Sequence, residues 1–253
     1  MNRSVLVPKE PRRIVSLVPS QTELLFDLGL GDRVVGITKF CIHPEVWFRE
    51  KTRVGGTKSV DFKKISQLAP DLIIGNKEEN TQSDIEALES LYPVWMSDIK
   101  TLDDAKTMIR EVGEITRTGS AANQLVFNIE QEFAKLQTSS RKRALYLIWK
   151  NPFMGVARDT FIHQMMVQAG FENVLEDERG RYPELTAEQI EQLDPEYILL
   201  SSEPFPFSGK HSEEVREQFP LRKIVELDGE MFSWYGSRLR LSPLYFKRLR
   251  DTF

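Results

Sequence analysis

Short apolar runs alternate with amphipathic segments along the first half of the chain. The β-branched run 13–18 predicts a strand. Residues 22–29 predict a helix, because Leu24, Leu25 and Leu28 share one face and Gly29 is a typical left-handed stop. The same alternation predicts further strands at 33–38, 69–75 and 93–96, and further helices at 61–68, 85–91 and 101–116. Alternating strands and helices favour an α/β fold with a parallel sheet.

The second half of the chain repeats this pattern. Four positions of one helix–strand segment recur 125 residues later: Ile65, Leu68, Pro70 and Ile73 return as Ile190, Leu193, Pro195 and Ile198. The expected strands 143–149 and 223–228 and the expected helix 163–170 also have counterparts in the first half. The repeat predicts two pseudo-symmetric lobes with mainly parallel sheets; the alternative is two similar layers of one large sheet.

A single long helix is expected between the two halves. Residues 120–136 carry apolar side chains at helical spacing and contain neither glycine nor proline. A helical connection of this kind is stiffer than a flexible Gly/Ser linker. The expected organisation is therefore an N-terminal α/β lobe at 1–118, a rigid linking helix at 119–140 and a C-terminal α/β lobe at 141–253.

Composition narrows the class of protein. The 253 residues contain 40% hydrophobic side chains and carry a net charge of −4, which predicts a packed core and gives no basic excess for nucleic acid. No apolar run approaches the roughly 20 residues that span a bilayer, so membrane insertion is not expected. The start lacks the apolar core of a signal peptide. The expected location is cytoplasmic if Met1 is the true start, and periplasmic or membrane-associated if a leader was removed.

Catalytic motifs are missing from the sequence. It contains no phosphate-binding loop, no His-Glu-x-x-His and no Gly-x-Ser-x-Gly, which predicts a protein that is not an enzyme. Cys41 and His43, two positions apart, are a candidate thiolate–imidazole pair, but a semi-buried structural cysteine is the more frequent alternative. One cysteine and three scattered histidines predict no metal site.

Aromatic residues cluster in the expected loops. In α/β proteins ligands bind beyond the carboxyl ends of the strands, so aromatic side chains there are candidates for a pocket. Flat rings suit a large planar or amphipathic ligand, although such rings also seal loops against the core. The aromatic loop residues are Phe40, Trp47, Phe48, Trp149, Phe153, Tyr182, Phe205, Phe207, Phe232, Trp234 and Tyr235.

Several segments resemble the cobalamin-binding periplasmic proteins. These are residues 13–29 and 32–38, Val54-Gly55-Gly56-Thr57, and the segments 68–74, 170–174 and 193–198. Such proteins are receptors of ABC importers with a helical backbone between two lobes, a superfamily that includes siderophore and haem receptors. The resemblance implies the substrate-binding component of an ABC importer, with a corrinoid bound between the lobes. It also implies no intrinsic cofactor, a permease partner and a monomer; cobalamin or another metal-bearing tetrapyrrole or chelate is the transported ligand.

The resemblance and the loop aromatics together define the expected site. The family's Pro–Ser turn corresponds to Pro19 and Ser20, and a tryptophan that precedes a proline corresponds to Tyr182. Thr57 stands where relatives carry a tryptophan, a departure from the corrinoid pattern. His43 is expected to bind cobalt axially or to hydrogen-bond a polar ligand edge; the alternative is a loop histidine that is hydrogen-bonded to the backbone. The expected ligand-binding residues are Pro19, Ser20, Phe40, His43, Thr57, Trp149, Phe153, Tyr182, Trp234, Tyr235 and Arg238.

Family receptors also present one glutamate per lobe to the permease. The expected docking residues are Glu78 with Glu79, and Glu203; Glu78 and Glu203 are again 125 positions apart.

Two alternative functions of the protein remain open. An iron–siderophore or haem receptor would use basic residues such as Arg53, Lys58, Arg158, Arg181 and Arg238. A cytosolic enzyme or chaperone built on the same fold would use the region of Cys41 and His43.

Overall fold

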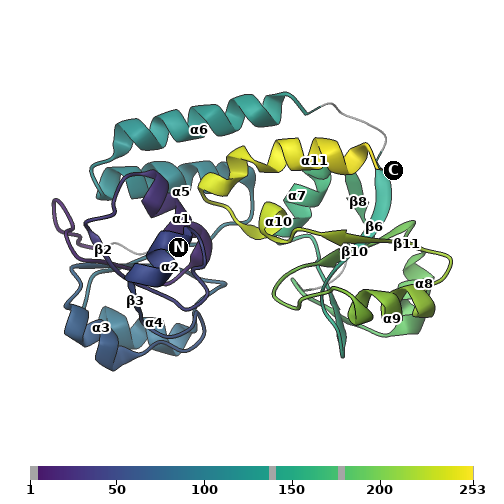
Figure 1. Ribbon diagram of the computed structural model, residues 1–253, viewed down its shortest axis with the longest axis horizontal. Coiled ribbons are helices and arrows are strands. Elements are labelled where there is room, and N and C mark those ends of the chain that lie inside the picture. Colours follow the sequence, from purple (N-terminus) through teal and green to yellow (C-terminus); the bar gives the residue numbers. More distant parts are fainter. Residues whose placement is uncertain (1–4, 137–140, 176–179, 253) are drawn as a thin grey trace. The chain divides into compact units, whose positions relative to one another are not determined.

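The computed structural model describes residues 5–136, 141–175 and 180–252, and the chain divides into two compact units. The first unit comprises the chain up to Ile99, Asp103–Glu130 and Trp234–Arg240. The second comprises Lys100–Leu102, Gln131–Ser233 and the chain from Leu241 onward. The expected α/β class and two lobes with mainly parallel sheets are confirmed. Figure 1 labels their elements.

The first unit contains a five-stranded sheet in which every neighbouring pair is parallel. The strand order is β3 (Thr52–Arg53), β2 (Val34–Ile37), β1 (Ile14–Ser16), β4 (Leu72–Asn76) and β5 (Val94–Ser97). Because the strands are parallel, the loops that follow them all leave from one edge of the sheet. The residues at this carboxyl edge are therefore brought together although they are distant in sequence.

Helices cover the first sheet. Ile65 of α3 (Phe62–Leu68) and Ile85 and Leu88 of α4 (Gln82–Glu89) pack on Val15 and Ile73 of the strands. The remaining helical elements of this unit are α1 (Pro19–Asp27), α2 (Glu45–Glu50), α5 (Leu102–Ile115), the greater part of α6 (Gly119–Ala134) and the 3-10 helix η1 (Ser237–Arg240).

Helix α6 is the long helix expected between the halves, and the chain passes from the first unit to the second within it. Residues 137–140 of the expected linking segment lie outside the described residues. The approach of α5 to α6 is close, because a Cβ atom at Gly113 would lie 2.4 Å from the Cβ of Ala122. Glycine is therefore required at position 113.

The second unit repeats the strand order of the first. Strands β8 (Phe171–Asn173), β6 (Lys142–Trp149), β10 (Tyr197–Ser201) and β11 (Lys223–Leu227) are parallel neighbours, in the order of β2, β1, β4 and β5. Strands β7 (Phe153–Gly155) and β9 (Glu184–Leu185) add an antiparallel extension beside β6. The helices are α7 (Phe161–Ala169), α8 (Ala187–Leu193), α9 (Lys210–Gln218), α10 (Glu230–Ser233) and α11 (Ser242–Arg250).

The 125-residue repeat is a repeat of whole elements. Shifting α3 and β4 by 125 positions reproduces the bounds of α8 and β10. Both helices end on a residue in the left-handed conformation, Ala69 with φ 42° and Asp194 with φ 47°. Both begin at a residue whose side chain accepts a backbone N–H, Asp61 in α3 and Thr186 in α8. Each unit thus builds the same helix–turn–strand segment.

Candidate functional site

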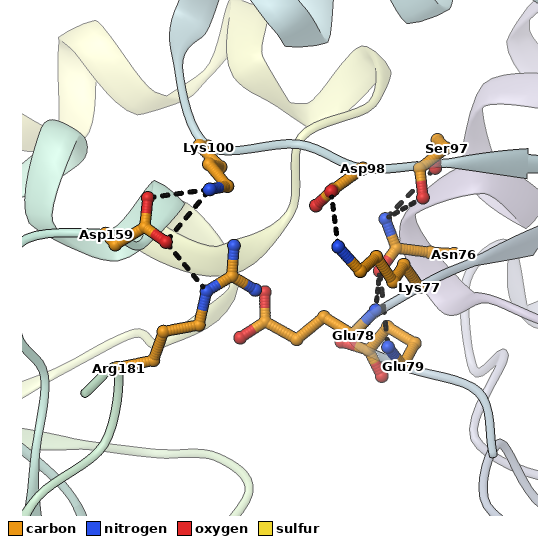
Figure 2. A network of polar contacts seen from close by, with 9 residues as sticks. All are labelled: Asn76, Lys77, Glu78, Glu79, Ser97, Asp98, Lys100, Asp159 and Arg181. Atoms are coloured by element: carbon orange, nitrogen blue, oxygen red, sulfur yellow. Dashed lines mark hydrogen bonds and ion pairs between the residues drawn. The ribbon is translucent and has the colours of Figure 1, made fainter. Parts of the chain in front are cut away.

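A network of buried amides and hydroxyls lies at the carboxyl edge of the first sheet. The hydroxyl of Ser97, at the end of β5, accepts hydrogen bonds from the side-chain amides of Gln21 at 2.7 Å and Asn76 at 3.0 Å. Figure 2 shows the pair formed by Asn76 and Ser97. The Asn80 amide donates to the carbonyl of Thr57 at 3.0 Å, and its oxygen accepts the N–H of Asn76 at 2.8 Å. The network holds together the loops that follow the strands.

The loop after β2 carries the most exposed aromatic ring among the expected site residues. Phe40 is 51% exposed, and the Lys39 ammonium lies 5.0 Å from its ring centroid. The ring packs on the Gly-Gly-Thr turn, because a Cβ atom at Gly56 would lie 3.2 Å from Phe40 Cε2. Phe40 and Thr57, which are distant in sequence, are therefore neighbours across this turn.

Cys41 is enclosed rather than reactive. It has no exposed surface, Thr22 donates a hydrogen bond to its Sγ at 3.1 Å, and the Thr38 hydroxyl lies 3.2 Å from the same atom. Burial raises the pKa of the Cys41 thiol, so the neutral form prevails at neutral pH. The His43 ring meets the edge of Trp234, with centroids 5.5 Å apart. These contacts favour the structural interpretation of Cys41 over the nucleophilic one.

The segment Trp234–Arg240 packs on helix α1. Arg238 donates two hydrogen bonds to the Glu23 carboxylate, at 2.9 and 2.7 Å, and its guanidinium lies 4.7 Å from the Trp234 ring centroid. Gly236 fits where a Cβ atom would lie 2.4 Å from the carbonyl oxygen of Ser20. The first unit therefore brings together the Pro–Ser turn, His43 and this segment.

The expected site residues of the first unit differ in how accessible their side chains are to a ligand. Trp234, Tyr235 and Arg238 are buried, as are Ser20 and Thr57. Pro19 and His43 are half-buried. The Arg238 side chain already forms an ion pair with Glu23, which indicates a structural role for this arginine. Phe40, His43 and Pro19 are the side chains of the first unit most available to a ligand.

The second unit presents a separate aromatic cluster beyond the end of β6. Trp149 is 40% exposed, and Phe205 lies against it with ring centroids 5.4 Å apart. Phe205 also contacts His211, with centroids 4.9 Å apart. Phe153, by contrast, belongs to the hydrophobic core and packs on Phe219, so we leave it out of the proposed site.

Tyr182 follows Arg181, which lines a pocket of the second unit. Tyr182 is half-buried, and the backbone on either side of it is fixed, because the carbonyls of Arg181 and Pro183 accept the N–H groups of Ala157 and Gly155. The pocket has a volume of about 760 Å³, within the range of small-molecule sites. Its lining includes Lys100, Arg158, Asp159, His163, Gln164 and Arg181. Arg158 and Arg181 are among the basic residues singled out in the sequence, whereas Lys100 lies in no motif.

Of the expected docking glutamates, Glu78 and Glu203 occupy equivalent positions, two residues beyond β4 and β10, and Glu79 follows Glu78. The Asn76 side-chain oxygen accepts the N–H groups of Glu78 at 2.8 Å and Glu79 at 3.2 Å, which fixes the turn after β4 (Figure 2). In the second unit the Ser233 hydroxyl donates to the Glu203 carboxylate at 2.5 Å. All three glutamates are half-buried.

The described residues form neither a metal-binding cluster nor a membrane-spanning helix. Over residues 5–136, 141–175 and 180–252, no group of three or more His, Cys, Asp or Glu side chains is arranged to hold a metal ion. No helix in that same part of the chain combines the length and the apolar character needed to cross a bilayer.

The comparison with known families shows to which family the chain belongs. Residues 14–223 match the family model described as periplasmic binding protein, and the chain belongs to that family. It is 25% identical to the vitamin B12-binding protein of Pectobacterium carotovorum subsp. carotovorum, over 92% of this chain and 86% of that one. It is 30% identical to an uncharacterized ABC transporter substrate-binding lipoprotein, YvrC, of Bacillus subtilis, over 79% of this chain and 67% of that one.

Solved structures share the fold. The periplasmic haem-binding protein RhuT of Roseiflexus sp. RS-1, in its apo form, superposes with a TM-score of 0.80 at 20% identity, over 96% of this chain and 99% of that one. This likeness supports the fold and leaves the ligand open.

Proposed function

We propose that this chain is the substrate-binding component of an ABC importer and that its ligand is a corrinoid. Membership in the periplasmic binding protein family supports the transport role. The similarity to a vitamin B12-binding protein over 92% of the chain is the observation that carries the ligand class. The ligand is cargo, and the protein itself needs no cofactor.

The proposed ligand contacts are accessible side chains near strand ends, most of them aromatic or polar. In the first unit these are Phe40, His43 and Pro19, held in place by the buried Ser20, Thr57, Trp234 and Tyr235. In the second unit they are Trp149 and Tyr182. An exposed ring such as Phe40, 51% accessible and braced on the Gly56 turn, offers a flat apolar surface at little conformational cost.

A haem or ferric siderophore is the second candidate ligand. The basic pocket of the second unit, lined by Lys100, Arg158 and Arg181, favours it, because haem propionates and many ferric chelates are anionic. The Thr57 position, where the corrinoid receptors carry a tryptophan, also favours a ligand other than intact cobalamin.

The visible absorption of the protein after incubation and desalting tests the ligand class. Purified protein is mixed separately with cobalamin, haemin and a ferric siderophore, then passed over a desalting column. We expect the cobalamin absorption to elute with the protein. Retention of haemin or the siderophore alone would replace the corrinoid by the second candidate, and retention of none would contradict the binding function.

The variant Phe40→Ala tests the site. Removing a stacked ring costs roughly 1–1.5 kcal/mol, so we expect the ligand dissociation constant to rise about tenfold. Phe127→Ala is the matched control, because Phe127 is a similarly exposed phenylalanine, 54% accessible, on α6. Equal affinities of the two variants, measured by quenching of tryptophan fluorescence, would remove Phe40 from the site.

We also propose that the protein acts outside the cytoplasmic membrane, as its family's description implies. Fractionation of the native host with an antibody tests this location. Recovery of the protein in the cytosolic fraction alone would favour the cytosolic alternative.

A further inference from the structure

The basic pocket of the second unit has a feature that a purely aromatic corrinoid site does not need. Lys100, Arg158 and Arg181 line one cavity of about 760 Å³, and Asp159 is the one carboxylate among its described lining residues. Figure 2 shows Lys100 and Arg181 directed at the same Asp159 carboxylate. Within the part of the chain that the structure describes, three basic side chains and one acidic side chain thus line the pocket.

Asp159 binds two of these cations. The Lys100 ammonium lies 2.8 Å from Oδ1 and 2.9 Å from Oδ2, and the Arg181 Nε donates to Oδ2 at 3.4 Å. The Lys100 ammonium, followed by Arg181, lowers the pKa of the Asp159 carboxyl, which is therefore ionised at neutral pH. A carboxylate thus already occupies the position between the two basic groups.

These ion pairs are open to exchange. The Asp159 side chain is 59% exposed and that of Lys100 is 40% exposed, and exposed ion pairs contribute little to stability. A second carboxylate or a phosphate can replace Asp159 at a small cost, because the cations keep an anionic partner throughout.

Arg158, next to Asp159, supplies a further positive charge. Its side chain is exposed, and its guanidinium forms no hydrogen bond or ion pair with any residue that the structure describes. Arginine presents parallel N–H donors that match a carboxylate or phosphate. An anion that displaces Asp159 therefore gains a bidentate partner that Asp159 itself does not use.

Hydrogen bonds hold the backbone around these side chains in place. The N–H of Ala157 donates to the Arg181 carbonyl at 2.9 Å, and the Thr160 hydroxyl donates to the Ala157 carbonyl at 2.8 Å, so both strands of chain that carry the arginines are tied together. The Asn173 amide nitrogen donates to the Val156 carbonyl and lies 3.2 Å from His163 Nδ1. The contact holds the His163 ring in the pocket wall.

We propose that this pocket binds an anionic edge of the transported ligand, a carboxylate or phosphate group, and that Asp159 is the internal anion that the ligand displaces. The inference rests on the proposed function and narrows its substrate class. The favoured cargo is a corrinoid that carries free carboxylates or a phosphate, and the selecting residues are Arg158, Arg181 and Lys100.

A matched pair of corrinoids tests the charge requirement. Dicyanocobyrinic acid carries free carboxylates, and its heptamethyl ester has the same macrocycle without them. We expect the acid to bind at least tenfold more tightly than the ester, and Arg158→Gln to remove most of that difference. Arg248→Gln, an exposed arginine of α11 in the same unit, changes the net charge equally and should leave the preference intact.

The variant Asp159→Asn should change the affinity for the acid in the opposite direction to Arg158→Gln. Removing the internal anion should tighten binding of the acid and leave binding of the ester unchanged. Equal binding of acid and ester by the unmodified protein, or no effect of Arg158→Gln, would overturn the proposal while leaving corrinoid transport intact. Loss of acid binding in Asp159→Asn would also overturn it, because Asp159 would then be a ligand contact rather than a competitor.

Binding of small free anions tests the pocket independently of the rest of the proposed ligand site. In a titration of the ¹⁵N-labelled protein with citrate or inorganic phosphate, we expect a saturable shift of arginine Nε–Hε signals that disappears in Arg158→Gln. A shift with citrate or phosphate but no binding of any corrinoid would keep the anion pocket and contradict the proposed function. No shift, together with equal affinity for acid and ester, would contradict the pocket alone.

Discussion

At the scale of single residues, the contacts that define the first unit join positions far apart in sequence. Glu23 and Arg238 are 215 positions apart, and the side-chain exposures of 16% and 10% make them a largely buried pair. The sequence marks Arg238 only as a basic residue near aromatics. Its partner could not be predicted, because nothing in the local pattern of either segment indicates a contact over that separation.

The free energy of unfolding should be sensitive to this pair. Glu23→Gln leaves the Arg238 guanidinium without its counter-charge, and breaking a buried pair typically costs about 3–5 kcal/mol. We expect a loss of that size in urea unfolding followed by circular dichroism. Glu45→Gln breaks the exposed Glu45–Arg49 pair and should cost less than about 1 kcal/mol. Equal losses in the two variants would show that the Glu23–Arg238 contact is not buried in solution.

At the scale of elements, periodicity predicts the long and regular segments well. The expected helix at 61–68 and strand at 69–75 correspond to α3 and β4, and their recurrence at offset 125 corresponds to α8 and β10. Strands β7 and β9 were not predicted, because three- and two-residue strands contain too few positions to establish an alternation. Their placement matters, since β7 ends three residues before Arg158 and β9 begins three residues after Arg181.

The left-handed ends of the repeated helices give a second stability prediction. Ala69 adopts φ 42°, a conformation that costs a residue with a Cβ atom roughly 1 kcal/mol relative to glycine, and its side chain is exposed. Ala69→Gly should therefore raise the free energy of unfolding by up to about 1 kcal/mol.

The equivalent position in the second unit supplies the comparison. Asp194→Gly relieves the same backbone conformation but removes an ion pair with Arg222. The free energy of unfolding should therefore rise less than in Ala69→Gly. Thermal unfolding of both variants measures the difference. A destabilised Ala69→Gly protein would contradict the argument, since it would mean that the greater conformational entropy of glycine in the unfolded chain outweighs the relief of backbone strain.

At the scale of the whole molecule, the repeat predicts which residues are equivalent, and the structure gives their surroundings. Glu78 and Glu203 both follow their strands by two positions, as expected from the sequence. Their roles in docking stay predictions. The half-buried setting of both side chains, and the Ser233 contact of Glu203, could not be deduced from a pattern of charges.

Neutralising both glutamates tests the docking role. Glu78→Gln with Glu203→Gln removes charge while keeping an acceptor for Ser233, so the fold should be preserved. Charges across an interface steer association, and we expect the affinity for permease-containing vesicles to fall severalfold at low salt with ligand affinity unchanged. Glu50→Gln with Glu217→Gln, two exposed glutamates, is the control. Unchanged association of the docking variant would exclude Glu78 and Glu203 from the interface.

The return of Trp234–Arg240 to the first unit has a consequence for synthesis on the ribosome. At roughly 5–20 residues per second, Arg238 follows Glu23 by about 10–40 s. Throughout that interval α1 lacks the guanidinium, the Trp234 ring and the close-fitting Gly236 that complete its packing. The first unit therefore stays incomplete until residues 234–240 have been synthesised, so a nascent chain that stops before residue 234 presents an unsealed first unit to chaperones and proteases.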